Sequence, residues 1–174
     1  MKTATHATPT HRSRLPLAGA LLALLAATFF TGCATTPSLT SGQYREQAYQ
    51  EALRGEASLS IRDAKKAIAL NPKDQWTKVS YGWCLYTLGR YGPALTAWEN
   101  AYKLDPEGYR INACLAIANY RLGHLSAAVA SYNQQVMFDP AFGKWKSLQD
   151  ATSYWKPKEK SALYAVFNEW RKLH

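Results

Sequence analysis

The stretch from Gln75 to Pro106 decides the fold, and it reads QWTKVSYGWCLYTLGRYGPALTAWENAYKLDP. Two helical patterns meet in it at the LGR sequence of residues 88–90. Gly89 is suited to end the first helix in a left-handed conformation, and Pro93 suits the first turn of the second. Asp105 precedes a proline and is expected to end that second helix. Apolar residues of the second pattern are three or four positions apart and therefore share one helix face. They are Ala94, Leu95, Trp98, Ala101 and Leu104.

The same pattern recurs along the chain with a period of 34 residues. The positions that keep this period are Pro72, Pro106 and Pro140; Gly55, Gly89 and Gly123; and Leu70, Leu104 and Phe138. A helix–turn–helix unit of this length resembles the tetratricopeptide repeat. The resemblance implies three tandem repeats, about residues 43–74, 75–108 and 109–140, stacked into a short right-handed solenoid. The sequence departs from the family pattern at Gln135, where a small residue is expected, and at its first tryptophan position, which holds Tyr44, Lys78 and Asn112.

Residues 141–174 follow the repeats as a basic segment with one clear helical pattern at about residues 157–173. Apolar residues share one face of this helix: Leu163, Val166, Phe167, Trp170 and Leu173. Because an open stack of repeats needs a cap, we expect an amphipathic helix that covers the third repeat. A helix that binds a partner or a membrane surface is the alternative. The predicted fold class is all-α.

Residues 1–32 have the layout of a secretory signal peptide. Lys2, Arg12 and Arg14 form a basic head, and residues 15–30 are almost wholly apolar. This run has 16 residues, whereas a membrane-spanning helix needs about 20. A basic head, a short apolar run and small residues at its end are typical of a cleaved signal.

The FTGC sequence of residues 30–33 resembles the bacterial lipobox. The resemblance implies that Cys33 becomes the first residue of the mature protein and carries a diacylglycerol and an N-linked acyl chain such as palmitate. Ala34 follows it, which in a Gram-negative cell resembles the outer-membrane lipoproteins that face the periplasm. An ordinary signal peptide with a free cysteine nearby is the alternative. Residues 33–42, small and polar after the cysteine, are expected to form a flexible tether.

Positive charge is unevenly placed along the predicted mature chain and gathers in the segment from Ala141 onward. The formal net charge is +9 for all 174 residues. A basic surface close to a membrane suits anionic lipid head groups or an acidic partner. Nucleic acid also suits such a surface, but secretion makes it an improbable target. A solvated basic face with no partner is the alternative.

Residues that could carry catalysis are sparse, and we expect a protein that is not an enzyme. The predicted mature chain holds two histidines, His124 and His174, and the sequence has no cysteine–histidine spacing of a metal site. It has no phosphate-binding loop and no nucleophile elbow. No cofactor is predicted beyond the lipid on Cys33. Cys84 and Cys114 are interpreted as buried free thiols, with a disulfide as the alternative.

The resemblance to the repeat family implies a concave face lined by the first helix of each repeat. In the repeat register, the candidate partner-binding residues are Arg45, Tyr49, Trp76, Val79, Trp83, Tyr86, Arg110, Ile117, Tyr120 and Arg121. Tryptophan, tyrosine and arginine are the usual anchors of binding hot spots. A helix or an extended peptide with apolar anchors and some acidic residues would suit this surface. The alternative is that the aromatic residues only pack the core, covered in part by the tail of the same chain.

The predicted function is that of a membrane-anchored periplasmic adaptor or scaffold that binds a protein partner. By its layout the chain resembles lipoproteins that assist the assembly of pili, secretins or secretion machines. An envelope-maintenance factor that recruits peptidoglycan enzymes is the alternative. Self-association through the exposed ends of a short repeat stack stays open as well.

Overall fold

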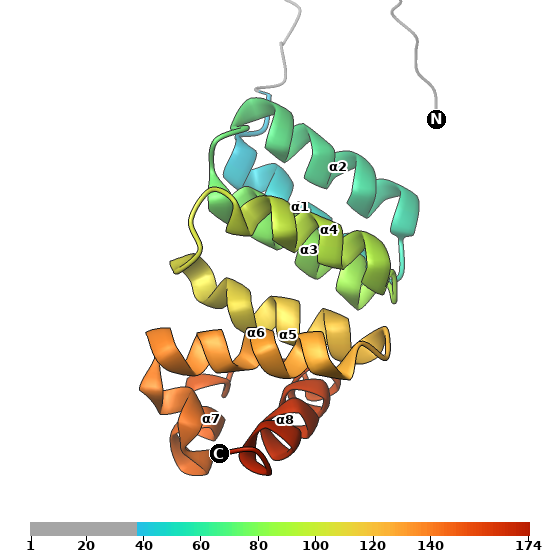
Figure 1. Ribbon diagram of the computed structural model, residues 1–174. Coiled ribbons are helices and arrows are strands. Elements are labelled where there is room, and N and C mark those ends of the chain that lie inside the picture. Colours follow the sequence, from blue (N-terminus) through green and yellow to red (C-terminus); the bar gives the residue numbers. More distant parts are fainter. Residues whose placement is uncertain (1–37) are drawn as a thin grey trace, which may run out of the picture. The chain divides into compact units, whose positions relative to one another are not determined.

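Residues 38–174 are described by a computed structural model, and they form eight α-helices and no β-strand (Figure 1). The helices are α1 (Ser41–Leu53), α2 (Ala57–Leu70), α3 (Gln75–Thr87), α4 (Tyr91–Tyr102), α5 (Ile111–Arg121), α6 (Leu125–Phe138), α7 (Trp145–Ala151) and α8 (Pro157–Arg171). Two single turns of 3-10 helix, η1 (Gly108–Arg110) and η2 (Pro140–Gly143), lie between them. The predicted signal peptide, Cys33 and the first half of the predicted tether lie outside the described residues.

The first helix begins earlier than the sequence pattern indicated. Thr40 is its N-cap, and the Thr40 hydroxyl accepts the Gln43 amide hydrogen at 3.3 Å. The Gln43 side chain in turn accepts the Thr40 amide hydrogen at 2.8 Å. This reciprocal capping box satisfies two backbone donors at the helix start. Ser41 and Gly42, predicted as the end of the tether, therefore belong to α1.

The first six helices form three pairs, α1 with α2, α3 with α4, and α5 with α6, which stack one after another (Figure 1). Each pair turns at a glycine of the 34-residue period, with φ of 77° at Gly55, 76° at Gly89 and 81° at Gly123. At the middle turn the Arg90 amide donates to the Leu85 carbonyl at 2.8 Å, which closes a Schellman motif. The predicted repeats and the left-handed Gly89 are confirmed.

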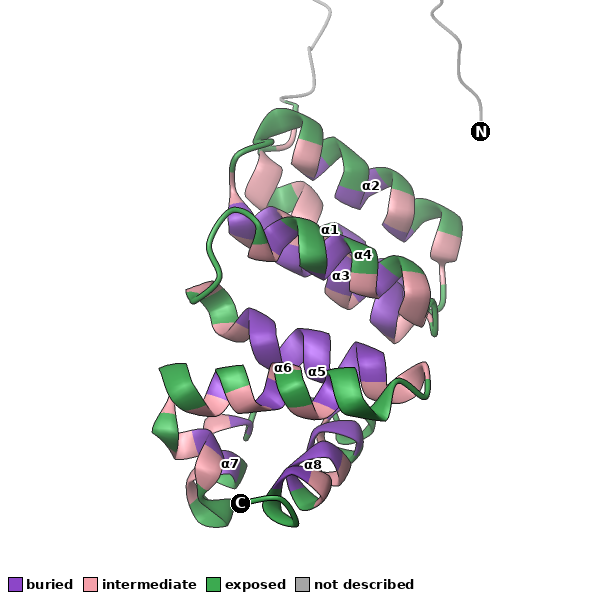
Figure 2. Cartoon of the chain, viewed as in Figure 1, coloured by how far each residue is buried: buried purple, intermediate pink, exposed green. Residues whose placement is uncertain are grey.

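The core runs along the interior of this stack, as the buried residues in Figure 2 show. Ala94, Trp98 and Ala101 on α4 are fully buried, as their spacing predicted. Leu104 was expected on the same face, but 46% of it is exposed. It lies beyond α4, which ends at Tyr102, before the Asp105–Pro106 sequence is reached. The equivalent residues of the other repeats, Leu70 and Phe138, are exposed as well.

The departure at Gln135 has a structural explanation. Its side chain is 3% exposed, and its Oε1 accepts the Ala113 amide hydrogen of α5 at 3.3 Å. The amides in the first turn of a helix have no partner within the helix. Gln135 thus supplies an acceptor that a small residue could not.

The last helix closes the third repeat, as predicted. It packs on both α5 and α6, and its buried face consists of Ala162, Leu163, Val166, Phe167 and Trp170. The Trp170 Nε1 donates to Asn133 Oδ1 of α6 at 3.0 Å. Leu173, predicted on this face, is 71% exposed because α8 ends at Arg171.

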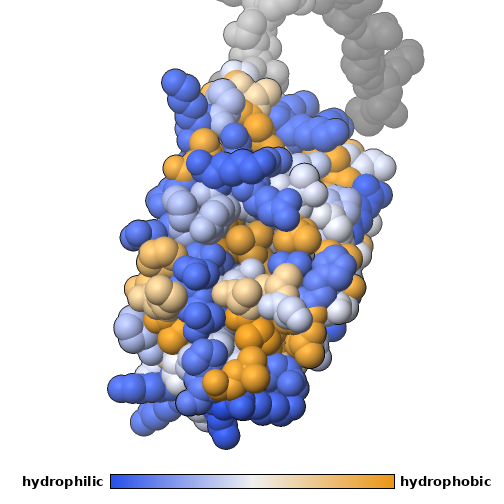
Figure 3. Space-filling model, in the orientation of Figure 1, coloured by the Kyte–Doolittle hydropathy of each residue, from blue (hydrophilic) through white to orange (hydrophobic). Residues whose placement is uncertain are grey.

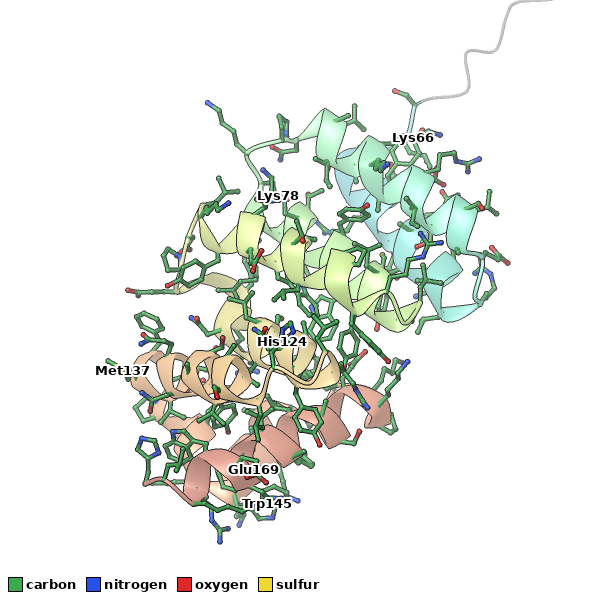
Figure 4. All side chains as sticks on the ribbon, turned by 45° about the vertical axis from the view of Figure 1, so that its right-hand side comes forward. Lys66, Lys78, His124, Met137, Trp145 and Glu169 are labelled. Carbon is green, nitrogen blue, oxygen red and sulfur yellow. The ribbon has the colours of Figure 1, made fainter. Side chains whose placement is uncertain are left out.

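The outer surface of residues 38–174 mixes apolar and charged side chains. On the face seen in Figure 3, hydrophobic side chains alternate with hydrophilic ones. Met137, at the end of α6, is 66% exposed and points away from the stack (Figure 4). None of the described helices is both long enough and apolar enough to span a membrane.

Candidate functional site

A groove of about 500 Å³ lies where the first two repeats meet the segment before α8. The residues that line it are Arg45, Glu46, Tyr49, Trp76, Ser80, Trp83, Tyr109, Arg110, Tyr154, Trp155, Lys156 and Glu159. They come from α1, α3, η1, the turn after α7 and the start of α8. Half of these residues are tyrosine or tryptophan, so the walls of the groove are largely aromatic.

The structure brings five of the ten predicted partner-binding residues together along this groove. They are Arg45, Tyr49, Trp76, Trp83 and Arg110. The repeat register placed them correctly on one surface, because equivalent positions of stacked helices face the same way.

Three other predicted residues, Val79, Tyr86 and Ile117, were wrongly assigned to the groove. Their exposed fraction is 0%, so they belong to the core and do not reach a partner. The physical reason is that α3 and α5 each lie between neighbouring helices and are packed on more than one side. A side chain of such a helix that points toward the concave side of the repeat stack is then covered by a neighbouring helix.

Tyr120 and Arg121 are partly exposed but do not line the groove. Arg121 has an internal role instead. Its Nε donates to the Tyr86 hydroxyl at 3.2 Å, and its Nη2 donates to the Lys158 carbonyl at 2.7 Å. These bonds tie the first turn of α8 to the second repeat.

The tail contributes a wall that the sequence did not predict. Trp155 is 6% exposed, and its ring meets Trp83 edge to face at a centroid distance of 5.1 Å. Tyr154, Lys156 and Glu159 line the groove beside it. Because the tail lies outside the 34-residue period, no register related these residues to the repeats. The contact of Trp155 with Trp83 agrees with the alternative reading, in which the tail of the same chain covers part of the aromatic surface.

A strained turn forms another wall of the groove. Tyr109 and Arg110 have φ of 51° and 54°, a conformation that costs a non-glycine residue roughly 1–2 kcal/mol. The Tyr109 ring stacks on Trp76 with centroids 4.9 Å apart. Arg110 Nη1 donates to the Ala151 carbonyl and, at 3.1 Å, to the Tyr154 hydroxyl. These contacts hold the turn, and such strain is concentrated at functional sites in proteins.

The groove carries charges of both signs. The Arg45 guanidinium lies 5.6 Å from the centroid of the Trp76 ring and 3.9 Å from the Asp74 carboxylate. Glu159 is 6% exposed, and burial raises its pKa above the usual range. Burial also raises the pKa of Tyr49 to about 12, and the nearby charge of Glu159 adds to this shift.

Two other hollows of similar size, about 510 and 520 Å³, lie between α6 and α8 and beside α3 and α4. They lack the aromatic walls of the groove. Residues 38–174 hold no cluster of three or more histidine, cysteine or acidic side chains arranged for a metal ion. Cys84 and Cys114 are buried and unpaired with each other, and burial raises the pKa of both thiols.

Comparison with solved structures supports the repeat fold. The Sgt2 tetratricopeptide-repeat domain from Aspergillus fumigatus superposes with a TM-score of 0.58 at 15% identity, over 76% of this chain and 80% of that one. The first such domain of Spaghetti (RPAP3), bound to the HSP90 peptide SRMEEVD, gives 0.56 at 12% identity, over 75% and 92%. No protein-family model and no curated protein sequence matches the chain.

A third similar structure is the type III secretion chaperone SycD of Yersinia enterocolitica in complex with a peptide of the translocator YopD. Its TM-score is 0.55 at 16% identity, over 74% of this chain and 92% of that one. At such identities the likeness establishes the fold alone. Residues 38–174 therefore have the fold of a tetratricopeptide-repeat domain with an added C-terminal helix.

Proposed function

We propose that this protein is an adaptor that binds a segment of another protein in its aromatic groove. The observation that carries the proposal is the groove itself, because Trp76, Tyr109 and Tyr154 stay accessible there although a folded core favours burying such side chains. Tyr109 is 55% exposed and Tyr154 is 71% exposed. Aromatic anchors around a concave site are the usual hot spots of protein recognition.

The similar structures support this reading by analogy. RPAP3 and SycD, which share the fold, were both solved with a peptide. The groove of this chain has room for a few side chains, since about 500 Å³ is within the size range of known ligand pockets. An extended segment with apolar anchors fits such a groove better than a flat protein surface does.

We further propose that Cys33 is lipidated and holds the domain at the periplasmic face of the outer membrane. The support is the lipobox-like sequence and the short interval between Cys33 and Ser41, where α1 begins. The groove would then lie close to the membrane. Partners in this setting include subunits of pili, secretins or secretion machines.

The test is a photocrosslinker placed at Tyr109 of the full-length protein in the cells that make it. Phe138 is the matched control, because it is an exposed aromatic residue outside the groove, 43% accessible. We expect Tyr109 to capture one envelope protein that Phe138 does not capture, and Cys33→Ser to move the protein out of the membrane fraction. Equal capture at both positions, or none at Tyr109, would refute the adaptor. Capture of cell-wall enzymes would identify the envelope-maintenance alternative.

A further inference from the structure

Glu159 is a buried acidic side chain in the wall of the groove. It lies in the first turn of α8 and is 6% exposed. Its Oε2 accepts the Lys156 amide hydrogen at 2.8 Å, which caps the helix. Its Oε1 accepts no hydrogen bond from the described residues, and this oxygen is not fully enclosed by the protein. Oε1 therefore keeps access to the open space of the groove.

Three of the cationic side chains near Glu159 contact other groups, whereas Lys156 lines the groove beside Glu159 without forming an ion pair with it. Burial raises the pKa of Glu159, and the charges of Lys156 and Lys158 oppose this shift. Arg45 lies over Trp76 and near Asp74, and Arg110 donates to the Ala151 carbonyl. The Lys158 Nζ lies 5.3 Å from the centroid of the Tyr91 ring. Within residues 38–174 no lysine or arginine nitrogen lies within 4.0 Å of the Glu159 carboxylate. Burying a carboxylate without a paired cation costs free energy, so we look for a function of Glu159 beyond folding.

Helix capping does not explain the charge. A glutamine at the third helical position caps as a glutamate does, and the Gln43 side chain does so at the start of α1. The rings of Tyr49, Trp83 and Trp155 line the same groove as the carboxylate. Aromatic faces attract cations, and they accept the apolar stem of a lysine or arginine.

We propose that the groove selects a partner segment with a lysine or arginine whose charged end pairs with Glu159 and whose stem lies against Trp83 and Trp155. This inference rests on the proposed peptide-binding function and specifies its ligand. It reverses the expectation of an acidic segment, because the arginines that suggested one are occupied within the chain. The other charged residues that line the groove are Glu46, Arg45, Arg110 and Lys156.

The experiment is a selection of random displayed peptides on the full-length protein and on three variants of it. Glu159→Gln removes the charge and keeps the cap. Glu169→Gln is the matched control on the same helix, because Glu169 pairs with Lys172 at 2.7 Å and lies outside the groove. Tyr109→Gly removes one wall, and glycine accepts the positive φ of that turn without strain.

We expect the wild type and Glu169→Gln to enrich peptides with a basic residue beside an apolar one. Glu159→Gln should enrich peptides with the apolar residue but without a preference for a basic neighbour. Replacing the basic residue of a selected peptide by glutamine should weaken binding to the wild type by about tenfold or more, and to Glu159→Gln by less than about twofold. Apolar peptides that need Tyr109 but show no basic preference would overturn the cation site and leave the adaptor function standing. If no selected peptide depends on Tyr109, both proposals fail.

Discussion

Gly82 is the residue whose replacement tests the packing of the repeats most directly. A Cβ placed on Gly82 would lie 2.2 Å from Trp98 Nε1, 2.4 Å from Cδ1 and 2.7 Å from Cε2. Carbon atoms in good contact are about 3.5–4.0 Å apart, so Gly82→Ala forces the indole to move by more than about 1 Å. The indole has no free space, because Trp98 is fully buried and packs against Trp83 and Tyr86.

The cost of Gly82→Ala follows from three terms. Overpacking a core costs about 1–3 kcal/mol. The Trp98 Nε1 donates to the Val79 carbonyl at 3.0 Å, and losing that bond inside the core costs about 1–3 kcal/mol. Alanine is favoured over glycine in a helix by about 1 kcal/mol, which offsets part of the loss. The free energy of unfolding should therefore fall by about 1–5 kcal/mol, with a central value of about 3 kcal/mol.

Urea unfolding followed by tryptophan fluorescence and far-ultraviolet circular dichroism measures this change. With an unfolding slope of about 2 kcal/mol per molar urea, a loss of about 3 kcal/mol lowers the midpoint by about 1.5 M. Gly92→Ala is the control, because a Cβ there meets no atom within 4 Å. In a Trp98→Leu background the cost of Gly82→Ala should shrink to below about 1 kcal/mol, since the obstructing ring is gone. An unchanged midpoint for Gly82→Ala in the wild type would refute the tight approach of α3 and α4.

Two further predictions concern the repeat turns and alkaline pH. Gly123→Ala should lower the free energy of unfolding by about 1–2 kcal/mol although no atom lies within 4 Å of the new Cβ, because the φ of 81° alone is unfavourable for alanine; a urea midpoint equal to that of Gly92→Ala would contradict this. Burial raises the pKa of the Cys84 thiol to about 11 and of the Tyr86 hydroxyl to about 12, so the stability that each contributes is complete below its unfolded pKa and is lost as pH rises through these values. Between pH 9 and pH 12 the loss should reach about 2 kcal/mol for each group, and Cys84→Ala should flatten the profile of the urea midpoint against pH.

The repeat architecture was predictable because its signals are local. A glycine with positive φ, a proline in a turn and an apolar stripe on α4 act within a few residues of one another. The three glycines at the helix turns make the same local hydrogen bonds in each repeat. The ends of the helices were less predictable, since Leu104 keeps the period yet follows the last helical residue.

The burial of Val79, Tyr86 and Ile117 could not be read from one helix at a time. An isolated amphipathic helix has one buried face, and its period predicts that face. The helices α3 and α5 each touch their own partner and helices on another side, α1 and α2 in the case of α3, and α4 and α8 in the case of α5, so two or more of their faces are buried. All nine residues from Ile111 to Asn119 on α5 are buried, and a helix buried on every side carries no periodic signal.

The chemistry of the groove depends on the part of the chain that has no repeat. Read from the repeats alone, the surface is aromatic with arginines at its edge, and such a surface favours an acidic partner. The tail changes that balance, because its backbone carbonyl at Ala151 and its Tyr154 hydroxyl engage Arg110 while Glu159 brings a carboxylate into the wall. The tail also places Lys156 in the wall, so a three-repeat stack without the tail would keep Trp76 and Trp83, lose Glu159 and Lys156, and free Arg110. Under the proposed pairing with Glu159, the preference of the groove for a cation or an anion is set by the C-terminal segment, and the aromatic anchors of the repeats are compatible with either.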